Sequence, residues 1–365
     1  MIDLTALPAM DVASRVDLVR RRFDAMAVDA LAVTNLTNVR WLTGFTGSNA
    51  AALVTADSLT LFTDGRYADQ APAQLSAAGV TAELEIGTDV IAGIDRTAPS
   101  VGRLGLEADH ATWQTQQRLA SDKRSLVPVV GALVELRSRK DAGEIARIRA
   151  AAAIADATLA EVAPSMADRP TEREAALALD TGMRRRGATG AAYETIVASG
   201  PNGALPHARP TDRVIEQGDL IVIDVGALVD GYRSDMTRTF VIGEPTAEQT
   251  RQLEVVRESQ AAGAAAVAAG VAASAVDAAC REVIADAGWE DRFTHGTGHG
   301  VGLDIHEQPR LNRISRDTLQ AGQLVTVEPG VYLTGEGGVR WEDLLLVTDD
   351  GADCLSGAPK DPVIA

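Results

Sequence analysis

The chain is poor in cysteine and in positive charge. It has only two cysteines, Cys280 and Cys354, among 365 residues, and no CxxC pair. A disulfide framework is therefore not expected, and the sequence suits a reducing compartment. Lysine and arginine together number 34, against 51 aspartates and glutamates, which gives a formal net charge of -17. Such an acidic surface repels phosphate backbones, so nucleic acid is not expected as a partner.

Long hydrophobic runs are also missing. The most apolar stretch, residues 261–273, is mostly alanine and glycine, and Ser274 and Asp277 follow it. A helix that spans a bilayer needs roughly 20 apolar residues, so no membrane span is predicted. The first ten residues do not show a basic segment followed by an apolar one, which is the pattern of a signal peptide. We therefore expect a cytoplasmic protein without a membrane partner.

The length predicts two domains, because 365 residues exceed what one hydrophobic core usually organises. We expect an α/β domain over residues 1–133 and a second domain over residues 134–365. In the first domain, apolar spacing predicts a helix at residues 12–27. Strands are predicted at residues 30–33, 50–55, 58–63 and 102–107. No cluster of catalytic residue types is visible in this domain.

The second domain repeats one order of elements. Four helix-start signatures pair a Ser, Thr or Asp with a polar acceptor three residues later. They are Asp141 with Glu144, Thr171 with Glu174, Thr246 with Gln249, and Ser274 with Asp277. Strand patterns follow the second and the fourth of these helices, at residues 193–242 and 293–348. Helix, helix and strands thus occur twice, which predicts an α+β domain of two similar halves about an internal pseudo-twofold axis.

Two aspartates lie near one predicted hairpin. Asp224 ends the apolar run LIVID, and a buried carboxylate is unfavourable unless it is paired or bound to a metal. The dipeptide Asp230-Gly231 predicts a two-residue turn, which places Asp224 opposite Thr237. Asp235 then lies on the same face as Asp224, as its diagonal neighbour. Either aspartate alone fits an N-cap or a turn, whereas the pair predicts a shared cation site.

Histidines are scarce but clustered. Three of the five, His295, His299 and His306, fall within twelve positions and alternate with glycines. Glycine lets the backbone approach a ligand or a metal closely. A lone histidine is usually a core or surface residue, but this cluster predicts a site.

Two glutamates in apolar strand patterns, Glu328 and Glu342, complete the set. Arg340 shares a face with Glu342, so it is predicted to orient that carboxylate, and a plain salt bridge between them is the alternative. Four carboxylates and one imidazole suit two divalent ions that share oxygens, with Mn²⁺, Co²⁺, Fe²⁺ or Zn²⁺ as candidates. Mg²⁺ or Ca²⁺ alone would not need the histidine. A structural site for a single metal is the remaining alternative.

The ordered set closely resembles the metal ligands of the pita-bread metallopeptidases, which include methionine aminopeptidase, aminopeptidase P and prolidase. The resemblance covers about residues 134–348 and includes the sequences PHARPT (206–211), SDMTRT (234–239) and VEPGVY (327–332). It implies a pita-bread fold for the second domain and two divalent metal ions per chain, foremost Mn²⁺. In the family scheme, one metal is bound by Asp224 and the other by His299 and Glu328. Asp235 and Glu342 bridge both.

The same scheme assigns the groups that act on the substrate. Glu328 is the expected proton shuttle. His207 and His306 are expected to hold the substrate and to stabilise the developing oxyanion. His295 is expected to support the loop that carries His299.

The first domain separates the subfamilies. The sequences NLTNVRWLTGFTG (35–47) and TDGRY (63–67) look like the creatinase/prolidase-like N-terminal domain of bacterial Xaa-Pro peptidases. Methionine aminopeptidases of this family generally lack that domain. We therefore predict an Xaa-Pro aminopeptidase, with an Xaa-Pro dipeptidase (prolidase) as the alternative. A non-catalytic binding protein on the same fold is a more remote alternative, because such relatives have lost ligands and all five are present here.

An Xaa-Pro peptidase needs a dedicated pocket, because the bond before proline is a tertiary amide without an N–H group. His306 and Tyr332 are predicted neighbours of the proline ring. Arg310 is a candidate receptor for the carboxylate of a dipeptide, or else a solvated surface charge. Proline-containing peptides or dipeptides are the expected partners. The resemblance also implies a homodimer in which the first domain shapes access to an active site.

Overall fold

The computed structural model describes residues 4–98, 102–122 and 124–364. The chain forms two compact units. One consists of Ala9–Arg137, and the other of Ser138–Ala365 together with the chain up to Pro8.

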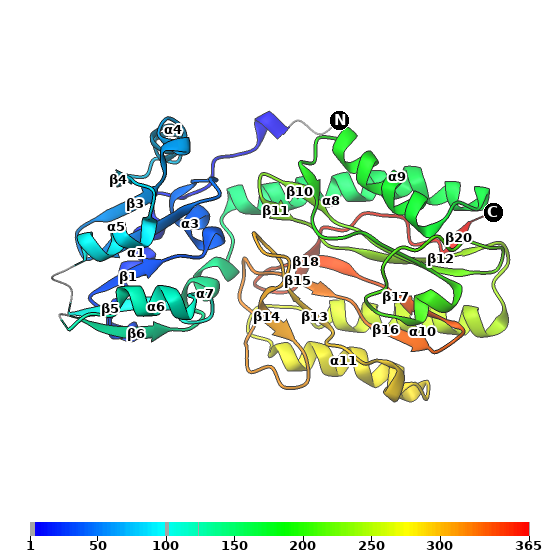
Figure 1. Ribbon diagram of the computed structural model, residues 1–365. Coiled ribbons are helices and arrows are strands. Elements are labelled where there is room, and N and C mark those ends of the chain that lie inside the picture. The colour runs from blue at the N-terminus through cyan, green and yellow to red at the C-terminus, as the bar shows by residue number, and fades with distance from the viewer. Residues whose placement is uncertain (1–3, 99–101, 123, 365) are drawn as a thin grey trace. The chain divides into compact units, whose positions relative to one another are not determined.

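The first unit is built on one six-stranded mixed sheet with strand order β4-β3-β2-β1-β5-β6 (Figure 1). β1 pairs antiparallel with β2 and parallel with β5, so it lies inside the sheet and all four of its residues are buried. The strands are β1 (Ala30–Val33), β2 (Ala50–Thr55), β3 (Leu59–Thr63), β4 (Glu83–Ile86), β5 (Arg103–Glu107) and β6 (Ser125–Val129). The helices are α1 (Arg15–Arg20), α2 (Phe23–Met26), α3 (Leu36–Thr43), α4 (Gln70–Ala77), α5 (Val90–Thr97), α6 (Trp113–Leu119) and α7 (Ala132–Ser138).

The four strands predicted in this unit are confirmed as β1, β2, β3 and β5. The single helix predicted at residues 12–27 is wrong, because α1 and α2 divide that segment. At the break the backbone tightens, and the N–H of Arg22 donates to the carbonyl of Val19, three residues earlier. Ala27 then ends α2 with a left-handed φ of 55°.

The boundary after residue 133 is corrected to one after Arg137. The reason is that α7 packs with the first unit. The guanidinium of Arg137 donates to Asn38 Oδ1, and Arg22 Nη2 lies 2.7 Å from Glu135 Oε1. These contacts involve side chains about 100 positions apart, which the local pattern of residues 134–140 does not reveal.

The chain up to Pro8 is likewise reassigned, from the first unit to the second. Leu4 and Leu7 pack against the hydrophobic core of the second unit. Arg147 Nη1 donates to the carbonyl of Pro8 at 2.8 Å.

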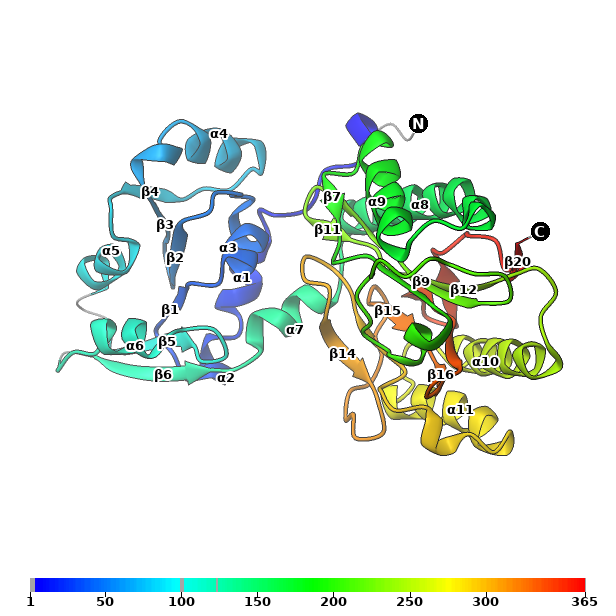
Figure 2. The same ribbon diagram turned by 45° about the vertical axis from the view of Figure 1, so that its right-hand side comes forward.

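The second unit contains two sheets between two pairs of helices. Figures 1 and 2 show α8 and α9 on one side and α10 and α11 on the other, with the strands between them. The helices are α8 (Ala142–Val162), α9 (Glu172–Arg185), α10 (Ala247–Ala265) and α11 (Ala273–Asp286). The order helix, helix, strands occurs twice along the chain, as the sequence predicts.

Most strands of each half pair within one sheet. The first half contributes β8, β9 and β12 to the sheet β20-β12-β9-β8, whose edge strand β20 comes from the C-terminal end of the chain, and the second half forms the sheet β14-β13-β15-β18-β19. The first sheet contains β8 (Ile196–Ser199), β9 (Leu220–Asp224), β12 (Thr237–Ile242) and β20 (Val363–Ile364). The second contains β13 (Gly298–Gly300), β14 (Glu307–Leu311), β15 (Leu324–Val327), β18 (Asp343–Val347) and β19 (Ala352–Cys354). Smaller sheets are formed by β7 (Gly190–Ala191), β10 (Ala227–Val229) and β11 (Tyr232–Arg233), and by β16 (Gly330–Leu333) with β17 (Gly337–Arg340).

Three of the four predicted helix starts are confirmed as capping boxes, with Asp141, Thr171 and Thr246 as the N-caps. The fourth is wrong. Helix α11 begins after Ala272, which offers no side-chain cap. Asp277, the predicted partner of Ser274, instead accepts hydrogen bonds from the backbone and hydroxyl of Thr297. Its carboxylate thus holds the start of the segment that leads to β13.

Close packing joins the helices of the second half to each other. A Cβ atom added at Gly263 in α10 would lie 2.2 Å from Cys280 Sγ in α11, so only glycine permits this approach. The helix pair and β15 share one buried cluster that includes Val276 and Val327. In the described part of the chain, no helix is both long and apolar enough to cross a membrane.

Candidate metal centre

Two carboxylates of the centre come from one hairpin of the first half. Asp230 and Gly231 have positive φ values of 45° and 76°, as a two-residue hairpin turn requires. The pairing continues to Asp224 opposite Thr237, which confirms the predicted register. Asp224 ends β9, and Asp235 lies two residues before β12. Both side chains line the same cavity.

Three further donors come from the second half. His299 is the middle residue of β13, Glu328 follows β15, and Glu342 precedes β18. The backbones approach very closely here, since a Cβ atom on Gly298 would lie 1.9 Å from the carbonyl oxygen of Thr326. A larger residue at position 298 would push His299 away from Glu328.

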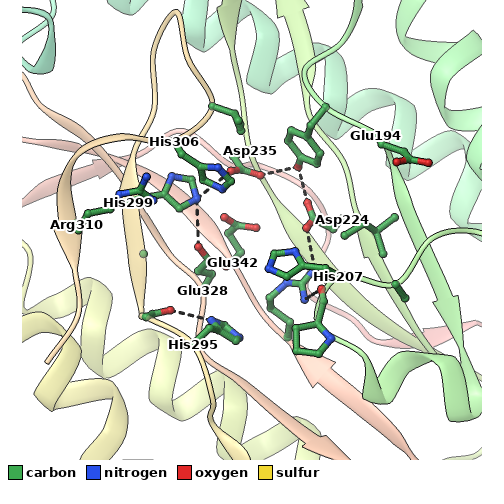
Figure 3. Close-up of a pocket in the computed structure, with 18 of the residues that line it drawn as sticks. Glu194, His207, Asp224, Asp235, His295, His299, His306, Arg310, Glu328 and Glu342 are labelled. Atoms are coloured by element: carbon green, nitrogen blue, oxygen red, sulfur yellow. Dashed lines mark hydrogen bonds and ion pairs between the residues drawn. The ribbon is translucent and has the colours of Figure 1, made fainter. Parts of the chain in front are cut away.

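The donors of the two halves meet in one cavity (Figure 3). The nearest ligand atoms of Asp235, His299 and Glu342 lie within 4.8 Å of one another. His299 Nε2 lies 3.3 Å from Glu328 Oε1 and 3.6 Å from Asp235 Oδ2. Glu342 Oε1 is buried and has no hydrogen-bond partner among the described residues. A buried carboxylate oxygen without a donor is suited to a cation.

The pKa values of the clustered carboxylates also indicate a site for cations. Burial and the charge of Asp224 raise the pKa of Asp235 to about 8. Burial and the charge of Asp235 raise the pKa of Glu342 well above its ordinary value. Burial also raises the pKa of Glu328, but the hydrogen bond and charge of His299 outweigh it and hold that pKa at about 2. The carboxylates therefore repel one another strongly, and a pair of divalent cations would compensate their charge.

Tyr193 is a member of the centre that was not predicted from the sequence. Its hydroxyl lies within hydrogen-bond distance of Asp224 Oδ1 and of Asp235 Oδ1. Because a phenol has one proton, it donates to only one of the two carboxylates at a time. The strand pattern around Tyr193 gave no sign of this role, since the hydroxyl meets the aspartates only in the tertiary structure.

Arg340 orients a different carboxylate from the one predicted. Its Nη2 donates to Asp224 Oδ2 at 2.7 Å, and its Nε donates to Thr237 Oγ1 at 3.0 Å. Arg340 reaches Glu342 only through Thr237, whose hydroxyl donates to Glu342 Oε2 at 2.7 Å. The prediction considered only the alternation of side chains along one strand, whereas the partner lies on β9 of the other half.

The predicted substrate histidines line the cavity around the carboxylates. The ring centroids of His299 and His306 are 4.4 Å apart. Burial, together with the charges of His299 and Arg310, lowers the pKa of His306 to about 4. This imidazole is therefore neutral at pH 7. His207 is exposed and lines the same cavity.

His295 and Tyr332 form a second contact pair at the edge of the centre. His295 Nε2 lies 2.8 Å from the hydroxyl of Tyr332, and Arg340 Nη1 donates to that hydroxyl at 3.0 Å. His295 also lines the cavity. Tyr332, predicted to contact the proline ring, is buried behind the cavity wall and is not among the residues that line it in the described structure. Its position indicates that it holds His295 and Arg340 instead.

The pairing of β13 with β14 directs the side chain of Arg310 into the cavity. Arg310 pairs with His299 across β13 and β14, so the two side chains lie on the same face. Both line the cavity. In the described part of the chain, no carboxylate forms an ion pair with the guanidinium of Arg310, whereas Arg209 at the same cavity pairs with Glu194 at 3.2 Å.

Glu172, at the start of α9, holds both ends of the loop that carries His207. Its buried carboxylate accepts hydrogen bonds from the backbone and hydroxyl of Ser199, at 2.7 and 2.8 Å. It also accepts from the backbone and hydroxyl of Thr211, at 3.0 and 2.7 Å, and from Asn202 Nδ2. Burial raises the pKa of Glu172, but these hydrogen bonds outweigh it and lower the pKa overall. Glu172 was not singled out from the sequence.

Replacing Glu172 with alanine is expected to destabilise the protein by about 3 kcal/mol, because several buried donors lose their acceptor. Urea unfolding measures this change, and hydrogen exchange should become faster at residues 199–211. Glu174→Ala is the matched control on the same helix, because it removes only a capping-box glutamate and should lower stability by about 1 kcal/mol without changing exchange in the loop. Unchanged exchange at residues 199–211 in the Glu172 variant would contradict the assignment.

Comparisons with known proteins agree with this fold. Residues 146–349 match the family model described as Metallopeptidase family M24, and residues 15–139 match that of the Creatinase/Prolidase N-terminal domain. An uncharacterized peptidase of Bacillus subtilis is 36% identical over 354 residues, which are 96% of this chain and 99% of the relative. The chain is therefore a metallopeptidase with two domains.

Solved structures show the same similarity over the whole chain. An Xaa-Pro dipeptidase from Bacillus anthracis is 35% identical, with a TM-score of 0.92 and coverage of 96% of this chain and 99% of that one. An X-Pro aminopeptidase from Thermotoga maritima is 32% identical, with a TM-score of 0.85 and coverage of 94% and 99%. The chain belongs to metallopeptidase family M24, and its second unit has the pita-bread fold of that family.

Proposed function

We propose that the chain hydrolyses Xaa-Pro peptide bonds with the help of two divalent metal ions. The observation that carries the proposal is the convergence of five donors from both halves in one cavity: Asp224, Asp235, His299, Glu328 and Glu342. The names of the solved relatives, an Xaa-Pro dipeptidase and an X-Pro aminopeptidase, support the substrate class.

The proposed division of the donors is that of the family scheme. Asp224 would serve one ion, and His299 with Glu328 would serve the other. Asp235 and Glu342 would serve both, and their ligand atoms lie within 4.8 Å of each other and of a ligand atom of His299. Carboxylates and one imidazole suit Mn²⁺ first, with Co²⁺, Fe²⁺ or Zn²⁺ as alternatives.

The side chains around the donors divide the remaining tasks. When bound, two divalent ions supply Lewis acidity, which polarises the scissile carbonyl and lowers the pKa of water. Glu328 is ionised at neutral pH, so its carboxylate can accept a proton from the attacking water and deliver it to the departing proline nitrogen. His306 is neutral and can donate an N–H to the developing oxyanion. Arg340 and Tyr193 hold Asp224 in place.

The cavity suits a small peptide. Its volume is about 510 Å³, which lies within the usual range for small-ligand sites. A substrate amide before proline has no N–H group, so no protein acceptor is needed at that position. His207 and Ile196 lie on the wall formed by the first half, and His306 and Ile305 on that of the second.

The choice between a dipeptidase and an aminopeptidase depends on the substrate's carboxyl end. The sequence alone predicts the aminopeptidase, with the dipeptidase as the alternative. The guanidinium of Arg310 inside the cavity favours the dipeptidase, because it offers a cation to the carboxylate of a short substrate. We therefore propose Xaa-Pro dipeptides as the preferred substrates and longer Xaa-Pro peptides as the alternative.

Metal-loaded enzyme should be offered an Xaa-Pro dipeptide and an Xaa-Pro-Yaa-Zaa peptide side by side. We expect faster hydrolysis of the dipeptide. Arg310→Met should raise its KM by about tenfold to a hundredfold, because a charge-assisted hydrogen bond is lost, and should leave the longer peptide nearly unaffected. Arg313→Met, which removes an exposed charge on the same segment, is the control. Preferred cleavage of the longer peptide, together with an unchanged KM in Arg310→Met, would favour the aminopeptidase.

Dimerisation, the cytoplasmic location and the gating role of the first domain stay predictions from the sequence.

A further inference from the structure

The loop between His299 and His306 encloses the buried carboxylate of Glu307. Glu307 directly follows His306, and its residue pairs with Gly300, which directly follows His299. One carboxylate oxygen of Glu307 accepts the backbone N–H of Asp304 at 3.1 Å. A Cβ atom on Gly302 would lie 2.6 Å from the other oxygen, so the loop wraps closely around this carboxylate.

The counter-charge of Glu307 comes from a distant part of the chain. Lys140 Nζ lies 3.0 Å from Glu307 Oε2, and both side chains are only 1% exposed. Lys140 lies between α7 and α8, at the start of the second unit, and its ammonium also donates to the carbonyl of Ser138 at 3.1 Å. Its backbone N–H donates to the carbonyl of Gly322, which fixes the position of the lysine.

A buried ion pair of this kind adds little to the net stability of the fold. Lysine and glutamate are almost never fully buried unless paired, and the loss of hydration offsets most of their attraction. A pair of apolar side chains of similar volume is often equally stable. The ion pair does specify geometry, because a charged group buried in this place needs its partner at hydrogen-bond distance.

We propose that Lys140 and Glu307 are positioning residues that hold the loop of residues 301–306 so that His306 faces the substrate. The inference rests on the proposed function, because His306 acts on substrate only there. Neither member of the pair lines the cavity in the described structure. The pair therefore acts through His306 and not by contact with substrate. The opposite side of the loop is held by Arg233, which donates from its backbone to Gly302 and from Nε to the carbonyl of Leu303.

A double-mutant cycle tests the proposal. The variant Lys140→Met/Glu307→Met replaces the ion pair with apolar side chains, and it is made in the wild-type background and in the His306→Ala background. In the wild-type background we expect kcat/KM for an Xaa-Pro dipeptide to fall by about tenfold to a hundredfold. The reason is that the imidazole of His306 then lies slightly away from the position in which it contacts the substrate. In the His306→Ala background we expect no further loss. Metal content should remain that of the wild type in both.

Lys140→Met/Glu307→Gln provides the same test if the first double variant does not fold, because the amide keeps the size of the side chain and an acceptor for Asp304, and no buried charge is left without a partner. Arg124→Met is the control for destabilisation, since it removes a buried charge from the first unit. It should lower the melting temperature and leave kcat/KM of the folded enzyme unchanged.

The possible failures are distinguishable. If the wild-type enzyme cleaves the dipeptide but the pair variant loses the same factor in both backgrounds, the pair does not act through His306 and the proposal is overturned. The same holds if the pair variant keeps full kcat/KM in the wild-type background. If metal-loaded wild-type enzyme cleaves no Xaa-Pro bond, the proposed function fails, and this inference fails with it.

Discussion

Asp235→Asn is expected to lower kcat/KM by at least about 10³-fold and to abolish binding of the metal pair. Asp235 contacts residues of both halves of the domain. Its Oδ2 lies 3.6 Å from His299 Nε2 of the second half, and its Oδ1 is close to the hydroxyl of Tyr193 of the first half. An amide has the same shape but lacks the charge and one acceptor oxygen, so it cannot serve two cations at once. Elemental analysis and the rate of dipeptide hydrolysis measure the two losses.

The same substitution should stabilise the protein once a chelator has removed divalent ions. Burial and the charge of Asp224 disfavour ionised Asp235, and a neutral amide removes that repulsion. At pH 8 the chelated variant should therefore unfold at a higher temperature than the chelated wild type. Asp353→Asn, which changes an exposed carboxylate paired with Arg149, should alter neither quantity. If Asp235→Asn kept the wild-type rate with two bound ions, the assigned centre would be wrong.

The second large effect is on stability as a function of pH in the chelated protein. Three of the five candidate metal ligands have pKa values in the folded state above their ordinary values. Burial and the charge of Asp224 raise the pKa of Asp235 from 3.8 to about 8. Burial and the charge of Asp235 raise the pKa of Glu342 above its ordinary value. For His299, burial lowers the pKa, but the hydrogen bond and charge of Glu328 outweigh it and raise it above 6.5. Each of these groups binds protons more tightly in the folded state, so each stabilises the fold at low pH and loses that contribution as the pH rises.

The window in which these groups dominate lies between pH 6.5 and pH 8. At lower pH the opposite effect enters, because burial lowers the pKa values of His295 and His306 below the ordinary 6.5, and stability gained from them increases with pH up to that value. Above pH 6.5 the three raised groups all act in one direction. The free energy of unfolding should therefore fall as the pH rises from 6.5 to 8, by up to about 1.4 kcal/mol per pH unit for each titrating group.

Urea unfolding at several pH values in the presence of a chelator measures this dependence. Addition of Mn²⁺ should raise stability at every pH and most strongly at pH 8, since cation binding favours the ionised carboxylates. The slope should be smaller in Asp235→Asn, which lacks one of the three groups. A chelated wild type that is equally stable at pH 6.5 and pH 8 would show that the carboxylates are not crowded in the way the structure describes.

The predicted hairpin shows how far local sequence patterns reach. Asp230 and Gly231 determine a two-residue turn, and the period of two along each strand then determines that Asp224 faces Thr237. This inference needs no knowledge of the rest of the fold. The capping boxes at Asp141, Thr171 and Thr246 were likewise predictable, because both partners lie within four residues.

The failures have a common cause. Asp277 follows Ser274 at the spacing of a capping box, but Thr297 and Arg281 provide its hydrogen bonds. Arg340 was predicted to share a strand face with Glu342, but its guanidinium donates to Asp224 of the other half. In each case a local rule predicted a nearby partner, and packing brought a distant one closer. Tyr332 failed in the same way, since its place behind His295 depends on how β16 meets the loop before β13.

By itself, the sequence determined the order helix, helix, strands that occurs twice in the second unit, the pairing of the hairpin that carries two aspartates, and the residue types suited to a pair of cations. These features depend on side-chain periods and turn residues that act over a few positions. Only the tertiary structure decided that the hydroxyl of Tyr193 meets both aspartates, that Arg340 holds Asp224, and that Lys140 neutralises Glu307. The partners in these contacts are from 31 to 167 positions apart, so their meeting depends on how whole sheets and helices pack.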